Sequence, residues 1–449
     1  MLHSAQIRYS LCCGGGLTLL GSLLAFSRLD DCSFFAALLL SVLLAVAAFF
    51  SLLPLRHAKL PCLIPCCVGA AMLLTVRILG FPEETSDFTN FLRPWTEYFR
   101  LNGNLRAIGP EVGNYNVPYL VLLAFFSYFK LPELYLIKFT SVLFDLLLAV
   151  SAAGLVREAG QSDDRSAVCW LLTLLLPTVV INGAVWGQCD SIYVSLGLLG
   201  LLLCMKGKPF WGMAAFGVSF AFKLQAVFLL PVVLLLLFAK KVKIWHLPAF
   251  PLAYLVAVSP AMLGGRGIWN TLLIYVNTAS TAGDGLNYNS PSVFSLPRFY
   301  WVTETAGAAR AGILAAFLLC VLVFILFFCR RKRITNRSLI FAALLFACGL
   351  PLFLPHMHER YFYLCDVLTL VVACVFPPAA ITVLFSQFAS LIGYHAYFYM
   401  RYLYPMRIGF YVLVVTLLAA AALTVLSLLW PEALERYLPE AESKNRLQP

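Results

Sequence analysis

Two histidines, a glutamate and an arginine stand together between two apolar segments of the sequence. The stretch 356–361 reads His-Met-His-Glu-Arg-Tyr; the apolar run 338–354 precedes it and the run 364–376 follows it. Ionisable side chains at such a depth cost about 2.5 to 3.5 kcal/mol each on insertion scales, so by default they line a cavity or a pathway. This stretch is therefore the first place to look for chemistry.

Three kinds of chemistry would use these side chains. His356, His358 and Glu359 could bind a divalent metal, but histidines two residues apart diverge on a helix and no second ligand cluster of convincing spacing exists. A proton-relay transporter would also use His and Glu. The third use is a cationic clamp for a lipid-linked phosphate, built from Arg360, Lys223 and the two histidines.

Lys223 and Gln225 interrupt a second apolar region. The segments 209–222 and 224–239 are each short for a membrane span, and together they predict a hairpin whose tip reaches into the membrane or its outer interface. The lysine could snorkel to the interface, but Gln225 is costly in lipid too. A cation that faces an anionic headgroup, such as a phosphate, satisfies both observations.

An acidic residue begins an amphipathic helix in the long polar segment 80–133. Asp87 stands at the N-terminal end of this helix, where it could cap the backbone or do chemistry, and the two roles are compatible. The helix is predicted to lie on the membrane surface because aromatic and aliphatic residues recur at helical spacing: Phe88, Phe91, Leu92, Trp95 and Phe99.

Other polar residues at the ends of apolar segments could bind a sugar or another polar ligand. For Tyr115 and Asn116, turn chemistry is the alternative explanation. For Trp186, Gln188 and Asp190, the alternatives are an aromatic-belt tryptophan and a capping aspartate. The full set of candidate acceptor- or sugar-binding residues is Tyr115, Asn116, Trp186, Gln188, Asp190, Asn287, Tyr288, Glu359 and Tyr361.

The composition describes a chain dissolved in lipid. Of the 449 residues, 61% are hydrophobic and only 12% are charged, whereas soluble domains carry roughly 25% charged residues. The net charge of +11 comes largely from clusters between apolar runs, such as 240–243 and 330–333. Such clusters orient a membrane protein, so a nucleic-acid partner is not expected. The 14 cysteines lie mostly in or beside apolar runs and pack as small hydrophobic residues.

The sequence predicts an all-α, polytopic transmembrane fold with about 13–14 spans. We expect one membrane domain, 1–430, with extracytoplasmic loops at 80–133 and 265–310, and a cytoplasmic tail, 431–449. The run 117–129 is too short to cross a core of about 30 Å, so it predicts an interfacial or re-entrant helix; as a full span it would put basic loops outside. The windows are 10–27, 33–54, 61–79, 134–156, 167–184, 190–205, 209–222, 224–239, 245–264, 311–329, 338–354, 361–376, 379–394 and 408–430.

The basic clusters also predict which segments share one face of the membrane. With 240–243 and 330–333 in the cytoplasm, the polar segments that carry the candidate residues all fall on the outer side. These segments are 80–118, 186–190, 265–310, 355–361 and 395–407.

Four motifs in this order resemble the GT-C superfamily of membrane glycosyltransferases, most closely the bacterial branch related to the second mannosyltransferase of GPI-anchor synthesis. The resemblance implies a polyprenyl-phosphate sugar donor, a catalytic base in the first outer loop, which maps to Asp87, and reaction on the extracytoplasmic side. No second aspartate adjoins Asp87, unlike in some relatives, which favours a metal-free mechanism. The motifs are Ser86-Asp87-Phe88; Trp186-Gly-Gln-Cys-Asp190-Ser; Lys223-Leu-Gln225 with Pro231; and His356-x-His358-Glu-Arg-Tyr361.

The residues are chemically consistent with this resemblance. One base is needed to deprotonate the acceptor hydroxyl as it attacks the anomeric carbon, and one candidate acid predicts inversion, since retaining enzymes use two. The leaving phosphate already carries its charge and needs cations, for which Arg360 and Lys223 are the main candidates, with His358, His356 and Gln225 beside them.

We therefore predict an integral-membrane hexosyltransferase, with mannose as the expected sugar, in the plasma membrane. Its partners would be a polyprenyl-phosphate sugar, a glycan or glycolipid acceptor and membrane lipid, with no metal and no cofactor. Two alternatives stay open: a lipid-linked-sugar or proton-coupled transporter, for which paired half-repeats would be expected, and a glycan polymerase or ligase.

Overall fold

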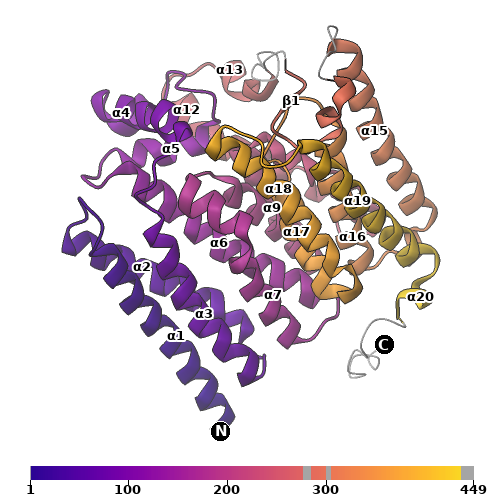
Figure 1. Cartoon of the computed structure of the whole chain (residues 1–449), viewed down its shortest axis with the longest axis horizontal. Helices are drawn as coiled ribbons and strands as arrows, with labels where there is room; N and C mark the ends of the chain where they lie inside the picture. The colour runs from indigo at the N-terminus through magenta and orange to yellow at the C-terminus, as the bar shows by residue number, and fades with distance from the viewer. Residues whose placement is uncertain (1, 277–284, 300–304, 436–449) are drawn as a thin grey trace.

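The structure is a computed structural model that describes residues 2–276, 285–299 and 305–435 (Figure 1). The predicted all-α polytopic class is confirmed. Among the described residues, nine helices are long and apolar enough to cross a membrane, or ten if a bent pair counts as one span. The long helices are α1 (Leu2–Phe26), α2 (Phe34–Leu52), α3 (Leu60–Leu79), α6 (Glu133–Glu158), α15 (Thr305–Cys329), α16 (Asn336–Phe353), α18 (Ile381–Tyr399) and α19 (Met406–Leu429). The ninth is α12 (Ala249–Leu263), which reaches spanning length together with the turn before it, as Ile244–Leu263.

Shorter helices fill the space between the long ones. They are α4 (Arg93–Leu101), α5 (Val117–Phe126), α7 (Asp163–Leu175), α8 (Pro177–Val180), α9 (Asp190–Met205), α10 (Pro209–Phe222), α11 (Pro231–Phe238), α13 (Ile268–Leu272), α17 (Tyr363–Val375) and α20 (Pro431–Glu435). Two π-helical turns are η2 (Phe88–Leu92) and η4 (Ile181–Trp186). The 3₁₀ turns are η1 (Leu53–Leu55), η3 (Asn104–Ala107), η5 (Leu224–Phe228), η6 (Ile244–His246), η7 (Val293–Ser295), η8 (Pro297–Phe299), η9 (Arg331–Arg333) and η10 (Pro377–Ala380).

The predicted number of spans counted several helices that are shorter than a membrane is thick. The helices α9, α10 and α17 contain 16, 14 and 13 residues, which at 1.5 Å per residue is less than a 30 Å hydrocarbon core. The prediction that α5 does not span has the same basis, because this helix has only ten residues. Its apolar side chains are largely buried against other helices, among them Val117, Leu120 and Leu123.

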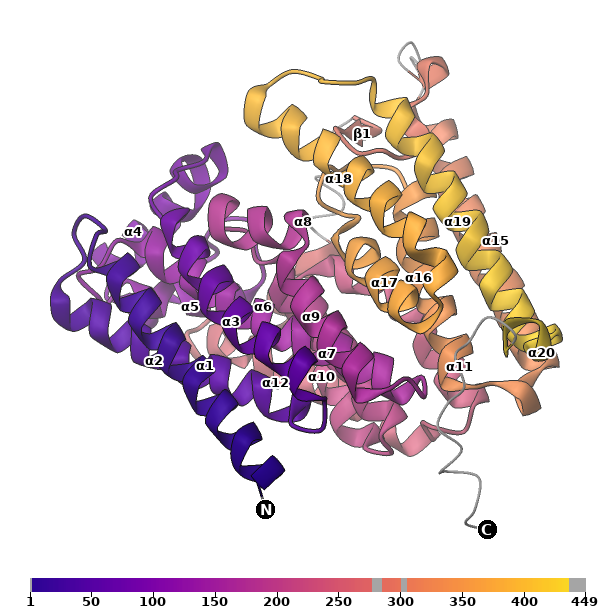
Figure 2. The ribbon, with the colours of Figure 1, turned by 60° about the horizontal axis from the view of Figure 1, so that its bottom comes forward.

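The core of the molecule surrounds α16. Of the most apolar window of this helix, 83% is buried, against 67% for α6 and 22% for α15. Figure 1 and Figure 2 show α1, α2 and α3 on one flank and α15 and α19 on the opposite flank. The helix that leads into the stretch 356–361, α16, thus lies inside the bundle.

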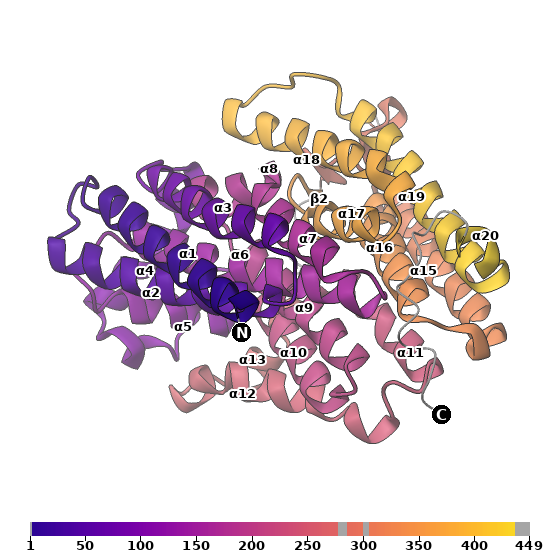
Figure 3. The same cartoon turned by 90° about the horizontal axis from the view of Figure 1, so that it is seen from below.

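The apolar window 167–184 does not form the single helix that we predicted. It breaks at Pro177 into α7 and the segment Pro177–Trp186, which meet at an angle of 52°. Proline has no N–H to donate, and it forces the preceding Leu176 into an extended conformation with ψ 123°. After the break, α8 runs beside α18 (Figure 3).

Basic residues gather at one end of the bundle. There Arg157 donates to the carbonyl of Pro54, Arg333 to that of Leu429, and Arg337 to that of Ala159. The polar loops that carry the candidate residues meet at the other end, where β1 (Asn287–Tyr288) pairs in parallel with β2 (Met357–His358). Of the predicted loop 265–310 and tail 431–449, residues 277–284, 300–304 and 436–449 lie outside the described residues.

Candidate active site

The carboxylate of Asp87 is held by hydrogen bonds from two side chains distant in sequence. The indole Nε1 of Trp186 and the amide Nε2 of Gln188 both donate to Asp87 Oδ2, at 3.0 and 2.7 Å. The capping role considered for Asp87 is wrong, because its backbone is already helical and its side chain makes no capping hydrogen bond. The carboxylate is thus oriented by the protein and keeps 23% exposure.

A left-handed glycine allows these two donors to reach the same carboxylate. The π-helical turn η4 ends at Gly187, which has φ 77° and ψ 30°, a conformation that glycine adopts without strain. The N–H groups of Gly187 and Gln188 both donate to the carbonyl of Asn182. This tight turn places the side chains on either side of the glycine toward Asp87.

Tyr397, from α18, completes the support of Asp87. Its hydroxyl accepts from the Asp87 N–H at 3.1 Å and lies 2.7 Å from Ser86 Oγ. Its ring stacks on Trp186 with centroids 4.1 Å apart. Trp186 is fully buried, so the alternative of an aromatic-belt tryptophan does not explain it, and its indole N–H orients Asp87.

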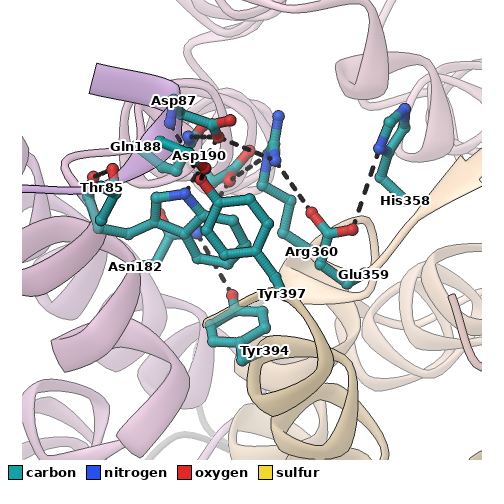
Figure 4. Close-up of polar contacts among 12 residues, drawn as sticks. Thr85, Asp87, Asn182, Gln188, Asp190, His358, Glu359, Arg360, Tyr394 and Tyr397 are labelled. Atoms are coloured by element: carbon teal, nitrogen blue, oxygen red, sulfur yellow. Dashed lines mark hydrogen bonds and ion pairs between the residues drawn. The ribbon is translucent and has the colours of Figure 1, made fainter. Parts of the chain in front are cut away.

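Arg360 lies among three carboxylates (Figure 4). Its Nη1 hydrogen-bonds to Glu359 Oε1 at 3.1 Å and lies 3.6 Å from Asp87 Oδ2, while its Nε is 3.8 Å from Asp190 Oδ2. The last two distances are ion-pair contacts that are too long for hydrogen bonds. The guanidinium also lies 5.4 Å from the centre of the Trp186 ring.

Lys223 reaches the same cluster but has a partner of its own. Its Nζ forms an ion pair with Asp190 Oδ1, and both side chains are buried, with 8% and 1% exposure. Asn182 Nδ2 donates to the other oxygen, Asp190 Oδ2, at 2.9 Å. Capping therefore does not explain Asp190, which sits at the first position of α9 and balances the charge of Lys223.

His358 and Glu359 occupy the exposed and the buried side of the same short strand region. The His358 ring stacks on Tyr288, with centroids 4.7 Å apart, and its Nδ1 is 3.9 Å from Glu359 Oε2. Partial burial lowers the pKa of His358 to about 3, and the charges of Arg360 and Lys223 act in the same direction. Burial raises the pKa of Glu359, although Arg360 opposes this. His358 is therefore neutral at pH 7 and offers a hydrogen bond instead of a charge.

Three other predicted residues border this cluster. The Tyr115 hydroxyl donates to Gln188 Oε1 at 3.3 Å. The Tyr361 ring lies 5.2 Å from that of His358, and the Gln225 side chain lies beside the Tyr361 hydroxyl. Gln225 thus reaches the cluster indirectly, through Tyr361.

The remaining predicted residues form local contacts. Asn116 accepts from the Val117 N–H as the cap of α5. Asn287 closes a turn through two hydrogen bonds with the backbone of Ser290. The His356 ring bonds to the carbonyl of Gly285 at 2.8 Å. These contacts hold loops together, and they leave binding roles for the three residues as predictions.

Sequence reasoning missed residues that hold the site together. Lys138 of α6 is fully buried and donates three hydrogen bonds to the carbonyls of Gly80, Phe81 and Glu83, just before Asp87. A lone lysine in an apolar run was a usable signal, since such residues are by default functional. Tyr397 gave none, because tyrosines are common at membrane interfaces.

Metal ligands do not gather in the part of the chain that the structure describes. No group of three or more His, Cys, Asp and Glu side chains there could hold a metal ion. Independence from metal nevertheless stays a prediction.

Fold and site together define a polytopic membrane protein with a carboxylate and arginine centre at one end. Residues 114–355 match the model of glycosyltransferase family 87. Because the match covers more than half of the 449 residues, the chain belongs to glycosyltransferase family 87, and it is a membrane glycosyltransferase. No curated protein and no solved structure matches it.

The family match covers only part of the site. Trp186, Asp190 and Lys223 lie within it, whereas Asp87 precedes it and Arg360 follows it. The roles of Asp87 and Arg360 therefore rest on the geometry described above.

We expect Tyr397→Phe to lower the rate of sugar transfer by about tenfold. The change removes the hydroxyl that binds Ser86 and the Asp87 N–H, and one hydrogen bond is worth about 0.5 to 1.5 kcal/mol. Initial rates of the purified enzyme measure the effect. Tyr399→Phe, on the same helix but 66% exposed, is the matched control, and equal rates for both variants would contradict the role of Tyr397.

Proposed function

We propose that this glycosyltransferase moves a hexose, with mannose as the first candidate, from a polyprenyl phosphate to an extracytoplasmic glycan or glycolipid. The reaction is an inverting displacement that needs no metal. The observation that carries the proposal is the accessible Asp87 carboxylate, oriented by Trp186 and Gln188, beside an arginine that has unused hydrogen-bonding capacity.

Accessibility separates Asp87 from the other acids as the base. The side chains of Asp190 and Glu359 are 1% and 4% exposed, against 23% for Asp87. Trp186 and Gln188 both donate to Oδ2, so Oδ1 receives neither of these bonds and is the oxygen we assign to the acceptor proton. A single accessible carboxylate supports inversion, since retention would require a second one as nucleophile.

Arg360 is suited to hold the donor phosphate. A guanidinium has five N–H donors, and within the described part of the chain its one side-chain hydrogen bond goes to Glu359. Its Nε is buried without a hydrogen-bond partner there. The free donors match the oxygens of a phosphodiester in bidentate geometry. Neutral His358 adds a donor, whereas the charge of Lys223 is balanced by Asp190.

The distribution of charge supports an extracytoplasmic site. Arg337 lies at the start of α16, whereas β2 follows the end of the same helix. The basic residues that bind Pro54, Ala159 and Leu429 therefore lie at the end opposite to β1 and β2. The positive-inside rule assigns that basic end to the cytoplasm. Asp87 and Arg360 then face the outer side, where lipid-linked sugars serve as donors because nucleotide sugars are absent there.

The proposal predicts that Asp87→Asn abolishes transfer from polyprenyl-phosphate mannose. Loss of a general base costs about 10² to 10⁴ in rate, while the amide still accepts from Trp186. Glu84→Gln, a change to an exposed acid in the same loop, should keep its rate. Full activity of Asp87→Asn in purified enzyme would show that the base is another residue.

Arg360→Ala should lower kcat/KM for the donor by about 10- to 100-fold, because a hydrogen bond to a charged group is worth about 1.5 to 3 kcal/mol. Titration of the polyprenyl-phosphate sugar at saturating acceptor measures this. Arg330→Ala, at the basic end, is the control. Equal effects of the two changes would argue against a phosphate clamp.

The membrane orientation can be tested by labelling intact cells with an impermeant maleimide. In a variant without the 14 native cysteines, Arg106→Cys should react and Lys332→Cys should react only after the cells are opened. Both positions are exposed and lie at opposite ends of the bundle. The reverse pattern would place the site in the cytoplasm.

A further inference from the structure

The bend at Pro177 leaves two backbone groups without helical partners. In an unbroken helix the N–H of Thr178 would donate to the carbonyl of Leu174. The extended conformation of Leu176 separates them, and both lie in the apolar interior, where an unpaired backbone group costs free energy comparable to a lost hydrogen bond. Side chains from two other helices form hydrogen bonds with these two groups.

Arg77 of α3 binds the carbonyl. Its Nη2 donates to the Leu174 carbonyl at 2.7 Å, and its Nε donates to Asp145 Oδ2 of α6 at 3.2 Å. The side chains of Arg77 and Asp145 are both 0% exposed. Asp145 thus neutralises the charge, and Arg77 connects the bend to α3, the helix that leads into the Asp87 loop.

Gln387 of α18 binds the amide from the other side. Its Oε1 accepts from the Thr178 N–H at 3.2 Å, and its Nε2 donates to Thr178 Oγ1 at 2.9 Å. Figures 2 and 3 show α8 beside α18. One side-chain amide therefore replaces the missing helical bond and also fixes the hydroxyl of the same residue.

The same helix meets the bent segment twice more, closer to the site. Tyr394 accepts from Asn182 Nδ2 at 3.3 Å, and its ring lies edge-on to Trp186, at 5.1 Å. Tyr397 stacks on Trp186. Positions 387, 394 and 397 lie within about a quarter turn of each other on a helix of 3.6 residues per turn, so one face of α18 follows the segment from the bend to Asp87.

We propose that Arg77 and Gln387 are positioning residues for catalysis, although neither reaches the site. By fixing the 52° bend they set where Trp186 and Gln188 stand, and through these two donors they set the orientation of Asp87. An apolar pair in place of Arg77 and Asp145 could stabilise the bundle equally well, but it would leave the Leu174 carbonyl unpaired. This inference rests on the proposed role of Asp87 as the base.

Gln387→Met tests the inference, because methionine keeps the length of the side chain and removes both hydrogen bonds. Hydrogen exchange of the full chain in lipid nanodiscs should accelerate in peptides covering 178–190. In sugar transfer, kcat should fall by up to about 10²-fold while the donor KM changes far less, since Arg360 is untouched. Thr382→Val, on the same helix, is the control: its buried hydroxyl donates to the carbonyl of Ala379 in η10, the turn just before α18, and both readouts should stay at wild-type values.

A second variant tests the other side of the bend. Arg77→Met/Asp145→Leu removes both charges together, so no unpaired charge is buried, and should show the same faster exchange and lower kcat. If Gln387→Met does not accumulate in the membrane, Thr178→Val replaces it. This change removes only the hydroxyl contact with Gln387, so exchange should accelerate and kcat should fall by smaller amounts. Unchanged exchange and unchanged kcat in these variants would overturn the inference.

The two proposals fail in different ways. A wild-type enzyme that does not turn over polyprenyl-phosphate mannose would refute the donor assignment, while the hydrogen exchange of 178–190 would still show whether Gln387 holds the bend. Normal turnover by the wild type, with a Gln387→Met variant that matches Thr382→Val, would refute only the positioning role.

Discussion

The burial of charge is the constraint on which the rest of this structure depends. A guanidinium, an ammonium and three carboxylates meet at the end of a bundle that is otherwise apolar, and each is costly there unless it is paired. Arg360 makes contacts with Asp87, Asp190 and Glu359. These contacts join the first loop, the start of α9 and the strand after α16 into one centre.

The same constraint explains why so many helices are short or broken. The polar residues of the centre stand at the ends of helices or just outside them. Asp190 is the first residue of α9, Lys223 follows α10, and Glu359 and Arg360 precede α17. Each interruption frees backbone groups that need partners inside the bundle. Lys138 and Arg77 supply such partners in the described chain, by donating to carbonyls at the end of α3 and of α7.

The composition and the polar motifs predicted the class of fold and many of the residues that meet. Charged residues in apolar surroundings are conspicuous, and for that reason Asp87, Asp190, Lys223 and Arg360 could be found before their contacts were known. What the sequence could not provide was the pairing. Lys223 was expected to bind a phosphate, but its charge is neutralised by Asp190. The sequence does not reveal this pair, because only the three-dimensional arrangement shows which cation faces which acid. The bend at Pro177 was missed, since hydropathy sums over a window and ignores one absent N–H.

The centre draws its parts from both ends of the chain, and this determines when it can exist. Asp87 is synthesised 310 residues before Tyr397, an interval of about 15 to 60 s at 5 to 20 residues per second. During that time the loop of Asp87 lacks the tyrosine that accepts from its backbone N–H, and for most of it the loop also lacks Arg360. A nascent chain therefore lacks the assembled centre until α18 has been synthesised.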